Sequence, residues 1–339
     1  MIMQTRTAHA VQINRYGPPE VLTYAEVLLV PLSAHEVRIK TLVAPVNHTD
    51  LEIRAGNWPV MKPDPFPYVP GVEALGVIEE VGEAVRGWAP GQNVITMMQG
   101  LGGVRGERPG GYAEFVTVDA EAVAVIPADV DPVQMAALGL VGVTAYLGLK
   151  RIGPLDGRRI LVTGAAGGVG SAATAIARAQ GASVIGLVSR PEQADYVRAL
   201  GADDVVVVSA KGSPPRLEPE SVDGVLDAVA GDLFGPCVSA LRSGGILSLV
   251  GAVSGGDVAF DAWQLIRPVT LTGYSTESLD GAALREAVTA LSRWIATKAI
   301  RPPDHQIMLL SEAVRAHRLM EEGRVKGRLL LMPSRPGAA

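Results

Sequence analysis

The feature that most constrains this sequence is a glycine-rich segment between an apolar run and a stretch of small residues. Gly164-Ala165-Ala166-Gly167-Gly168-Val169-Gly170 follows the strand-like run Ile160–Val162 and precedes a helical pattern that reaches Gln180. Small residues let the backbone turn sharply and approach a pyrophosphate, which the amides and positive dipole at the helix start can hold. The segment therefore predicts a strand–turn–helix unit that binds a dinucleotide through residues 166–170. A tight turn without a ligand is the alternative.

Strand and helix patterns alternate around this segment. Apolar runs at 184–188, 205–208, 224–226 and 246–250 are separated by helical stretches such as Pro191–Leu200. Such alternation is typical of a doubly wound parallel sheet. Before residue 127 and after residue 268, short β-type runs and Pro/Gly turns predominate. We expect an α/β fold with an α/β domain at 128–267 and a β-rich domain formed by 1–127 and 268–339.

Composition excludes several functional classes. The 339 residues carry a net charge of −5 without a basic run, so binding to nucleic acid or to an anionic membrane is not expected. The single cysteine, Cys237, fits a reducing compartment. The longest uncharged stretch, Pro132–Leu149, contains Gln134, Thr144 and three glycines, which favours a buried helix over a membrane span. We predict a soluble, cytoplasmic protein.

The end of the second α/β strand bears on the choice of cofactor. A carboxylate about 20 residues past the glycine turn would bind the adenosine ribose of NADH. Ser189 and Arg190 stand there instead, and a guanidinium can bind a 2′-phosphate through charge-assisted hydrogen bonds. These residues favour NADPH over NADH. Alternatively, Ser189 caps a helix and Arg190 is a solvated surface charge.

These residues, together with segments upstream, resemble the medium-chain dehydrogenase/reductase superfamily, and within it the zinc-free quinone oxidoreductase (zeta-crystallin-like) branch. The resemblance runs from Gly17-Pro-Pro-Glu-Val-Leu22 to Gly327-Arg-Leu-Leu-Leu331. The most specific segments are Gly71-Val-Glu73 with Gly76, Gly82 and Val85, then Pro90-Gly91-Gln-Asn-Val94, Gly110-Gly-Tyr-Ala-Glu114 and Ala165–Gly170. The resemblance implies a GroES-like catalytic domain built from both chain ends, an inserted Rossmann domain, an active site in the cleft and a homodimer.

Zinc enzymes of this superfamily bind their catalytic metal through Cys, His and a further Cys or acid. The matching positions here are Asn47, Val72 and Leu140, none of which is a useful zinc ligand. The five histidines, at 9, 35, 48, 305 and 317, show no ligand spacing. We therefore expect chemistry without zinc.

Without a Lewis acid, oxidation of simple alcohols is difficult, whereas a quinone or enone accepts hydride and spreads the charge onto oxygen. Such a reaction needs mainly proximity, hydrogen bonds to the oxyanion and a desolvated cleft. Asn47 is the candidate polar anchor near the nicotinamide of the cofactor and the substrate oxygen, and the resemblance implies that Asp50 orients its loop. Both residues also form turns readily.

The resemblance also assigns residues around the nicotinamide. Thr144 matches the threonine that backs the ring, although it could equally be a core residue. Gly251, Ala252 and Val253 follow a parallel strand, where ligands of such sheets bind, and would contact the carboxamide half of the cofactor.

Trp58 departs from the tyrosine that many quinone and enoyl-thioester reductases carry at this position. An indole N–H does not ionise at neutral pH, so Trp58 disfavours proton donation and suggests a flat wall for an aromatic substrate, or simple packing of the loop. The sequence thus favours an NADPH-dependent reductase of quinones or other conjugated carbonyls, with a small-molecule substrate. An enoyl-thioester reductase and a cofactor-binding protein with little catalysis are the alternatives.

Overall fold

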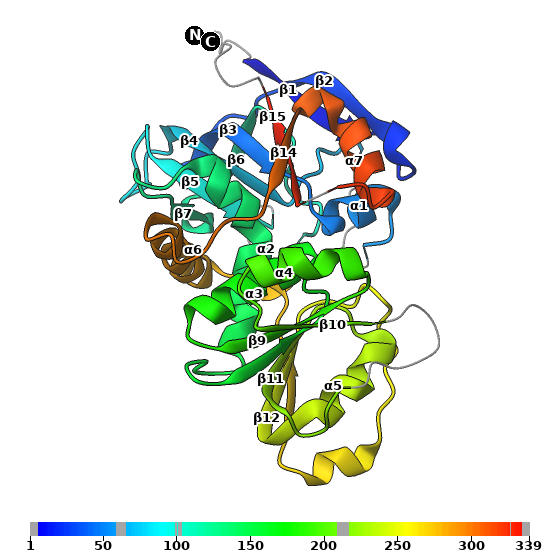
Figure 1. The fold of residues 1–339 in the computed structure, drawn as a ribbon. Coiled ribbons are helices and arrows are strands. Elements are labelled where there is room, and N and C mark those ends of the chain that lie inside the picture. Colours follow the sequence, from blue (N-terminus) through cyan, green and yellow to red (C-terminus); the bar gives the residue numbers. More distant parts are fainter. Residues whose placement is uncertain are drawn as a thin grey trace. The chain divides into compact units, whose positions relative to one another are not determined.

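The computed structural model describes residues 6–58, 66–98, 100, 104–208, 217–325 and 327–333, and it forms two compact units. The first unit comprises Met1–Leu140, Thr276–Arg293 and Asp304–Ala339, and the second comprises Val141–Ser275 and Trp294–Pro303. Segments from both ends of the chain therefore belong to one unit (Figure 1). The boundaries expected from the sequence, after residues 127 and 267, precede the divisions at 140 and 275.

A mainly antiparallel sheet forms the core of the first unit. Its strand order is β14-β15-β3-β4-β5-β7, with β6 also paired to β3, while β1 and β2 form a separate hairpin. Figure 1 shows the late strands β14 and β15 beside the early strand β3. The strands are β1 (Thr7–Ile13), β2 (Leu22–Leu28), β3 (Glu36–Pro45), β4 (Glu73–Val81), β5 (Asn93–Met97), β6 (Phe115–Asp119), β7 (Val123–Val125), β14 (His305–Leu309) and β15 (Arg328–Met332). The helices are α1 (His48–Ala55), α7 (Ala313–Glu321), most of α6 (Gly281–Ala296) and the first part of α2 (Pro132–Lys150).

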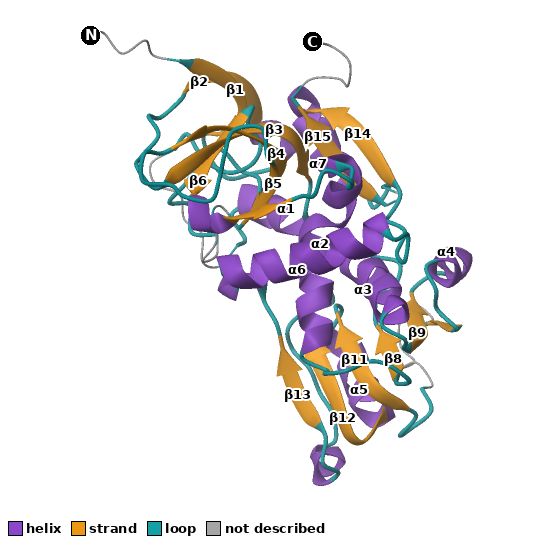
Figure 2. Cartoon of the chain, turned by 90° about the vertical axis from the view of Figure 1, so that its left-hand side faces the viewer, coloured by secondary structure: helices purple, strands orange, loops and turns teal. Residues whose placement is uncertain are grey.

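The second unit is built on a six-stranded parallel sheet with the order β10-β9-β8-β11-β12-β13. The strands are β8 (Arg159–Val162), β9 (Ser183–Val188), β10 (Asp204–Val207), β11 (Val222–Asp227), β12 (Leu241–Leu249) and β13 (Thr270–Gly273). Helix α3 (Gly168–Ala179) packs on β8 and β9, and α5 (Phe234–Ala240) packs on β11 and β12 (Figure 2). The chain order reverses between β8 and β11, which is where such sheets bind ligands. The predicted fold class is confirmed.

The predicted helix Pro191–Leu200 begins differently from a single α-helix. A 3-10 turn, η3 (Pro191–Gln193), precedes the short helix α4 (Ala194–Ala199). Gln193 accounts for this start, because its side-chain oxygen accepts the backbone N–H of Arg190 at 3.1 Å. The turn thus holds Ser189 and Arg190 at the carboxyl end of β9.

Helix α2 (Pro132–Lys150) is the only helix within the described residues that is long and apolar enough to cross a membrane. Its apolar 18-residue window is 78% buried inside the protein, as the sequence predicts for a core helix. Gly139, with φ 27° and ψ −125°, interrupts this helix, a feature that the sequence pattern does not indicate. A Cβ atom at this residue would lie 1.7 Å from Oε1 of Glu73, so only glycine fits.

A strained loop follows β11 at the reversal point of the parallel sheet. Ala230 has φ 57° and ψ −142°, dihedrals that residues with a Cβ atom rarely adopt. Its N–H donates to the buried Asp227 carboxylate at 3.1 Å, and the N–H of Val229 donates to the same oxygen at 2.9 Å. The Thr163 hydroxyl, at the end of β8, also donates to that oxygen at 2.6 Å. Asp227 therefore ties the loop to the start of the glycine turn.

We expect Ala230→Gly to raise the free energy of unfolding by about 1 kcal/mol, because glycine adopts these dihedrals without a steric penalty. This gain exceeds the extra entropy of the unfolded chain that a glycine brings. Urea denaturation followed by circular dichroism measures the change. As a control, Ala290→Gly inside α6 should lower stability by about 0.5–1 kcal/mol. A loss of stability in Ala230→Gly would contradict the assigned strain.

Candidate active site

The first unit holds a buried polar centre around the side chain of Asn47. This residue is the N-cap of α1 and is only 4% exposed. Its Oδ1 accepts a hydrogen bond from Nη2 of Arg328 at 2.8 Å, and its Nδ2 donates to Oε2 of Glu73 at 3.1 Å. The two charged partners fix which end of the amide is oxygen. One N–H and one lone pair of the amide remain for a ligand.

Glu73 lies at the start of β4 and connects several segments of this centre. Besides Asn47, its carboxylate accepts the backbone N–H of Leu140 at 2.9 Å, where α2 resumes after Gly139. The nearest guanidinium nitrogen of Arg328 lies 3.9 Å away. Burial raises the pKa of Glu73, and burial likewise lowers the pKa of Arg328. The two opposite charges compensate each other in a region without solvent.

The three positions at which zinc relatives carry metal ligands come together around this carboxylate. Asn47 and Leu140 both donate to Glu73, and Val72 immediately precedes it. In the part of the chain that the structure describes, no group of three or more His, Cys, Asp or Glu side chains could hold a metal ion. His48, beside Asn47, is exposed and contacts Glu52 at 3.4 Å.

Asp50 holds the loop before α1 against the segment that contains Val72. Its two carboxylate oxygens accept the backbone N–H groups of Asn47 and Val72, each at 2.8 Å. Burial raises the pKa of Asp50 to about 7, despite these two hydrogen bonds. Asp50 thus caps the backbone of α1, whereas the Asn47 side chain is engaged elsewhere.

Behind Asp50, a buried chain of hydrogen bonds runs through Tyr112 to His317. The Tyr112 hydroxyl bonds the Asp50 carboxylate and lies 3.1 Å from Nε2 of His317. Burial lowers the pKa of His317 to about 3, so its ring is neutral at physiological pH. When the Tyr112 hydroxyl donates to the Asp50 carboxylate, its oxygen accepts from His317 in the tautomer protonated at Nε2. This chain of hydrogen bonds stabilises the Asp50 carboxylate.

The second unit presents the glycine turn at the carboxyl end of β8. Gly170 is indispensable there, because a Cβ atom would lie 2.1 Å from the carbonyl oxygen of Gly164. Ala165 is fully buried and donates its N–H to Leu187 at 2.9 Å. In contrast, residues 166–169 are half-buried or exposed. Helix α3 begins at Gly168, and the first N–H groups of a helix have no internal acceptor. The donor set fits an anionic pyrophosphate.

Ser189 and Arg190 follow β9 along the same edge of the sheet. Both are exposed, and Nε of Arg190 lies 3.6 Å from a carboxylate oxygen of Glu192. The Ser189 hydroxyl contacts the side-chain oxygen of Gln193 at 3.3 Å. The Arg190 guanidinium is therefore accessible to a phosphate, and the Glu192 carboxylate lies close to it.

The remaining expected cofactor residues differ in exposure. Gly251, Ala252 and Val253 follow β12 at the same edge of the sheet, and Val253 is 70% exposed. Thr144, in the second half of α2, is only 8% exposed. The segment 251–253 is therefore open to a ligand, whereas Thr144 lies among core residues.

Sequence comparisons place this arrangement among known oxidoreductases. Residues 33–128 match the family of the alcohol dehydrogenase GroES-like domain, and residues 168–296 match the zinc-binding dehydrogenase family. A quinone oxidoreductase from Lama guanicoe is 32% identical over 256 residues, which are 73% of this chain and 74% of that protein. The chain belongs to the medium-chain dehydrogenase/reductase superfamily. It is an oxidoreductase of that superfamily.

Two further relatives of this superfamily member bear on its cofactor and substrate. The crystal structure of Escherichia coli quinone oxidoreductase, complexed with NADPH, superposes with a TM-score of 0.82 at 26% identity and covers 96% of this chain and 100% of that chain. An acrylyl-CoA reductase, AcuI, from Ruegeria pomeroyi is 32% identical over 253 residues, 72% of this chain and 74% of that protein.

Trp58 lies two residues after Gly56, the left-handed residue that ends α1. Its side chain is partly buried, and its indole nitrogen has no hydrogen-bond partner among the described residues. We expect the substrate wall to be formed around Trp58–Met61 and Met97–Leu101, but residues 59–61, 99 and 101 lie outside the described residues. Among the described residues of the second segment, Met97 and Met98 are buried.

Sequence reasoning assigned no role to several residues of this dehydrogenase/reductase site. Glu73 and Arg328 appeared only as parts of motifs, and Asp227 was not singled out. Each is a charged residue at the end of an apolar strand pattern and is buried in the structure. Because buried charges require partners, a charged residue at one end of an apolar strand was the signal from which a buried polar site could have been predicted.

We expect Glu73→Gln to lower the free energy of unfolding by about 3 kcal/mol, because it leaves Arg328 as a buried cation without its counter-charge. The NH2 group of the glutamine also faces one of the two N–H donors, that of Asn47 or that of Leu140, which then loses its acceptor. Chemical denaturation measures the loss. The matched variant Glu79→Gln, on the same strand, removes an exposed pair with Arg6 and should cost less than about 1 kcal/mol. Equal losses in the two variants would contradict this account.

Proposed function

We propose that this protein is an NADPH-dependent, zinc-independent reductase that transfers hydride to a quinone or another conjugated carbonyl compound. The fixed Asn47 amide supports this proposal most directly. Glu73 and Arg328 determine its orientation, and one N–H remains for a substrate oxygen. That group occupies a position at which zinc relatives hold a metal ligand.

The chemistry assigned to these residues is electrostatic. Bound NADPH supplies the hydride, and the acceptor carbon passes its charge to the carbonyl oxygen. The free N–H of Asn47 stabilises this oxygen, and the adjacent Arg328 guanidinium strengthens the effect in a region of low dielectric. Asp50 keeps the Asn47 backbone in place, and Trp58 offers a flat apolar surface to the substrate.

The cofactor assignment rests on the second unit. Residues 166–170 would hold the pyrophosphate, Ser189 and Arg190 the 2′-phosphate, and Thr144 with residues 251–253 the nicotinamide end. The NADPH-bound Escherichia coli relative supports this assignment. We also propose a small-molecule substrate and a cytoplasmic location, the latter because a single cysteine fits a reducing compartment.

A second candidate function is reduction of an enoyl thioester. The similarity to acrylyl-CoA reductase favours it. Trp58 argues against it, because an indole does not release a proton at neutral pH to the α-carbon of a reduced thioester. We therefore rank the quinone or enone reductase first.

We expect the purified protein to oxidise NADPH with 1,4-benzoquinone and 9,10-phenanthrenequinone, and at least tenfold more slowly with crotonyl-CoA. Loss of NADPH absorbance measures each rate. Activity should survive dialysis against a chelator, and elemental analysis should find no stoichiometric zinc. A preference for the thioester would establish the second candidate. NADPH binding without turnover of any acceptor would instead indicate a binding protein.

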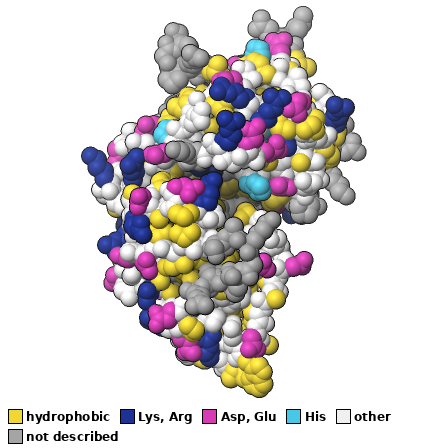
Figure 3. Space-filling model, turned by 45° about the vertical axis from the view of Figure 1, so that its right-hand side comes forward, with side chains coloured by type: hydrophobic (Ala, Val, Ile, Leu, Met, Phe, Trp, Pro, Cys, Tyr) yellow, Lys and Arg dark blue, Asp and Glu magenta, His cyan; other side chains and the backbone are white. Residues whose placement is uncertain are grey.

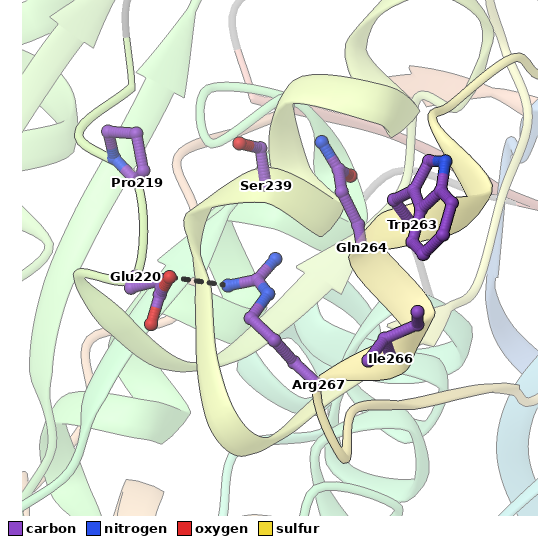
Figure 4. Close-up of a pocket in the computed structure, with 7 residues that line it drawn as sticks. All are labelled: Pro219, Glu220, Ser239, Trp263, Gln264, Ile266 and Arg267. Carbon is purple, nitrogen blue, oxygen red and sulfur yellow. Dashed lines mark ion pairs between the residues drawn. The ribbon is translucent and has the colours of Figure 1, made fainter.

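We also propose that the protein forms a homodimer through the second unit. Strand β13 is an edge of the parallel sheet, and the 3-10 segment η5 (Ala262–Ile266) shortly precedes it. There Trp263 is 75% exposed and Ile266 71% exposed, and hydrophobic side chains gather at this end of the second unit (Figure 3). Figure 4 shows both residues beside Arg267, which pairs with Glu220 at 3.6 Å, in an open pocket of about 490 Å³. Exposed aromatic and aliphatic groups beside a free strand edge are typical of such interfaces.

We expect light scattering after gel filtration to give twice the chain mass of 35.4 kDa. The double variant Trp263→Asp/Ile266→Asp should elute with the mass of one chain, because two buried charges would oppose association. Leu28→Asp, at an equally exposed apolar residue of the first unit, should remain dimeric. A wild-type protein with the mass of one chain would refute the dimer.

A further inference from the structure

The turn that follows β9 places an acid beside the arginine expected to bind the 2′-phosphate. Nε of Arg190 lies 3.6 Å from Oε1 of Glu192, and the two side chains are 61% and 69% exposed. We propose that Glu192 limits the selectivity of this site for NADPH over NADH, so that the protein binds both cofactors. This inference rests on the proposed dinucleotide-binding function.

The local backbone keeps the acid near the guanidinium. Pro191 and Glu192 belong to the 3-10 turn η3, and Gln193 closes that turn by accepting the N–H of Arg190. Gln193 also contacts the Ser189 hydroxyl. With the backbone held at both ends, only side-chain rotation can move the Glu192 carboxylate away from Arg190.

The two cofactors differ at one group, and Glu192 acts on that group in opposite directions. A 2′-phosphate carries two negative charges and accepts hydrogen bonds from a guanidinium. The Glu192 carboxylate competes for Arg190 and repels the phosphate. The 2′-hydroxyl of NADH has no charge and can donate a hydrogen bond to a carboxylate. Glu192 therefore weakens the binding of NADPH, whereas it leaves the binding of NADH unchanged or strengthens it.

The charges along the next helical turn do not offset this effect. Asp195 pairs with Arg198 at 3.1 Å, and Asp195 is 98% exposed. Residues 190–198 thus contribute two acids and two bases, with no net positive charge to attract a phosphate. Within residues 190–198, Arg198 pairs with Asp195, so Arg190 is the guanidinium that remains for the phosphate, and Glu192 weakens its binding.

The test measures dissociation constants of NADPH and NADH by isothermal titration calorimetry on the full chain. Glu192→Gln should lower the Kd of NADPH about threefold to fivefold, as expected for removal of a solvent-exposed charge interaction. The Kd of NADH should stay within about twofold or rise. At about 1 M salt, where the Debye length is ~3 Å, the gain for NADPH should largely disappear.

Two variants serve as controls. Asp195→Asn removes the same charge a few residues further along and should leave the ratio of the two Kd values nearly unchanged. Arg190→Glu should weaken NADPH binding far more than NADH binding. In an Arg190→Gln background, Glu192→Gln should have a smaller effect, because the competition for the guanidinium is absent.

The outcomes separate this inference from the function on which it rests. Equal changes for both cofactors in Glu192→Gln, or a gain equal to that of Asp195→Asn, would overturn the role of Glu192. Equal losses of NADPH and NADH in Arg190→Glu would overturn the assignment of the phosphate site itself. Failure of the wild-type protein to bind either dinucleotide would overturn the proposed function.

Discussion

The buried carboxylate of Glu73 is the interaction on which the first unit depends most. It connects the start of β4, the N-terminus of α1, the interruption of α2 and the first residue of β15 through Asn47, Leu140 and Arg328. A charge without solvent must be neutralised and hydrogen-bonded. Its presence therefore requires a glycine at 139, a donor at 47 and a cation at 328, which come from distant parts of the sequence.

The candidate residues around Asn47 and those around Arg190 differ in burial and therefore in the strength of their electrostatic interactions. Around Asn47 the charges of Glu73 and Arg328 are buried and face each other, so the geometry is set before any ligand arrives and resists change. Around Arg190 the side chains are exposed, and their interactions are weak and screened by salt. Such a division suits an oxidoreductase, because reactivity requires fixed donors, whereas cofactor choice depends on small differences in charge.

Much of the fold could be predicted because its signals are local. The glycine turn, the apolar runs at 160–162 and 184–188 and the helix after Gly167 each follow from neighbouring residues. The interruption of α2 could not be predicted this way, because its cause is a carboxylate 66 residues earlier in the chain. The same holds for the partners of Asn47 and for Asp227, whose hydrogen bonds join β8 to the loop after β11.

The sequence by itself determined the class of this protein: a parallel sheet with a glycine turn, joined to a β-rich domain, and residues that are not zinc ligands at the three positions 47, 72 and 140. These properties follow from short-range patterns and from the identity of single residues. The tertiary structure alone decided that Glu73 and Arg328 orient the Asn47 amide and that Glu192 accompanies Arg190. Contacts between side chains depend on three-dimensional distance and burial, which the linear order of residues does not contain.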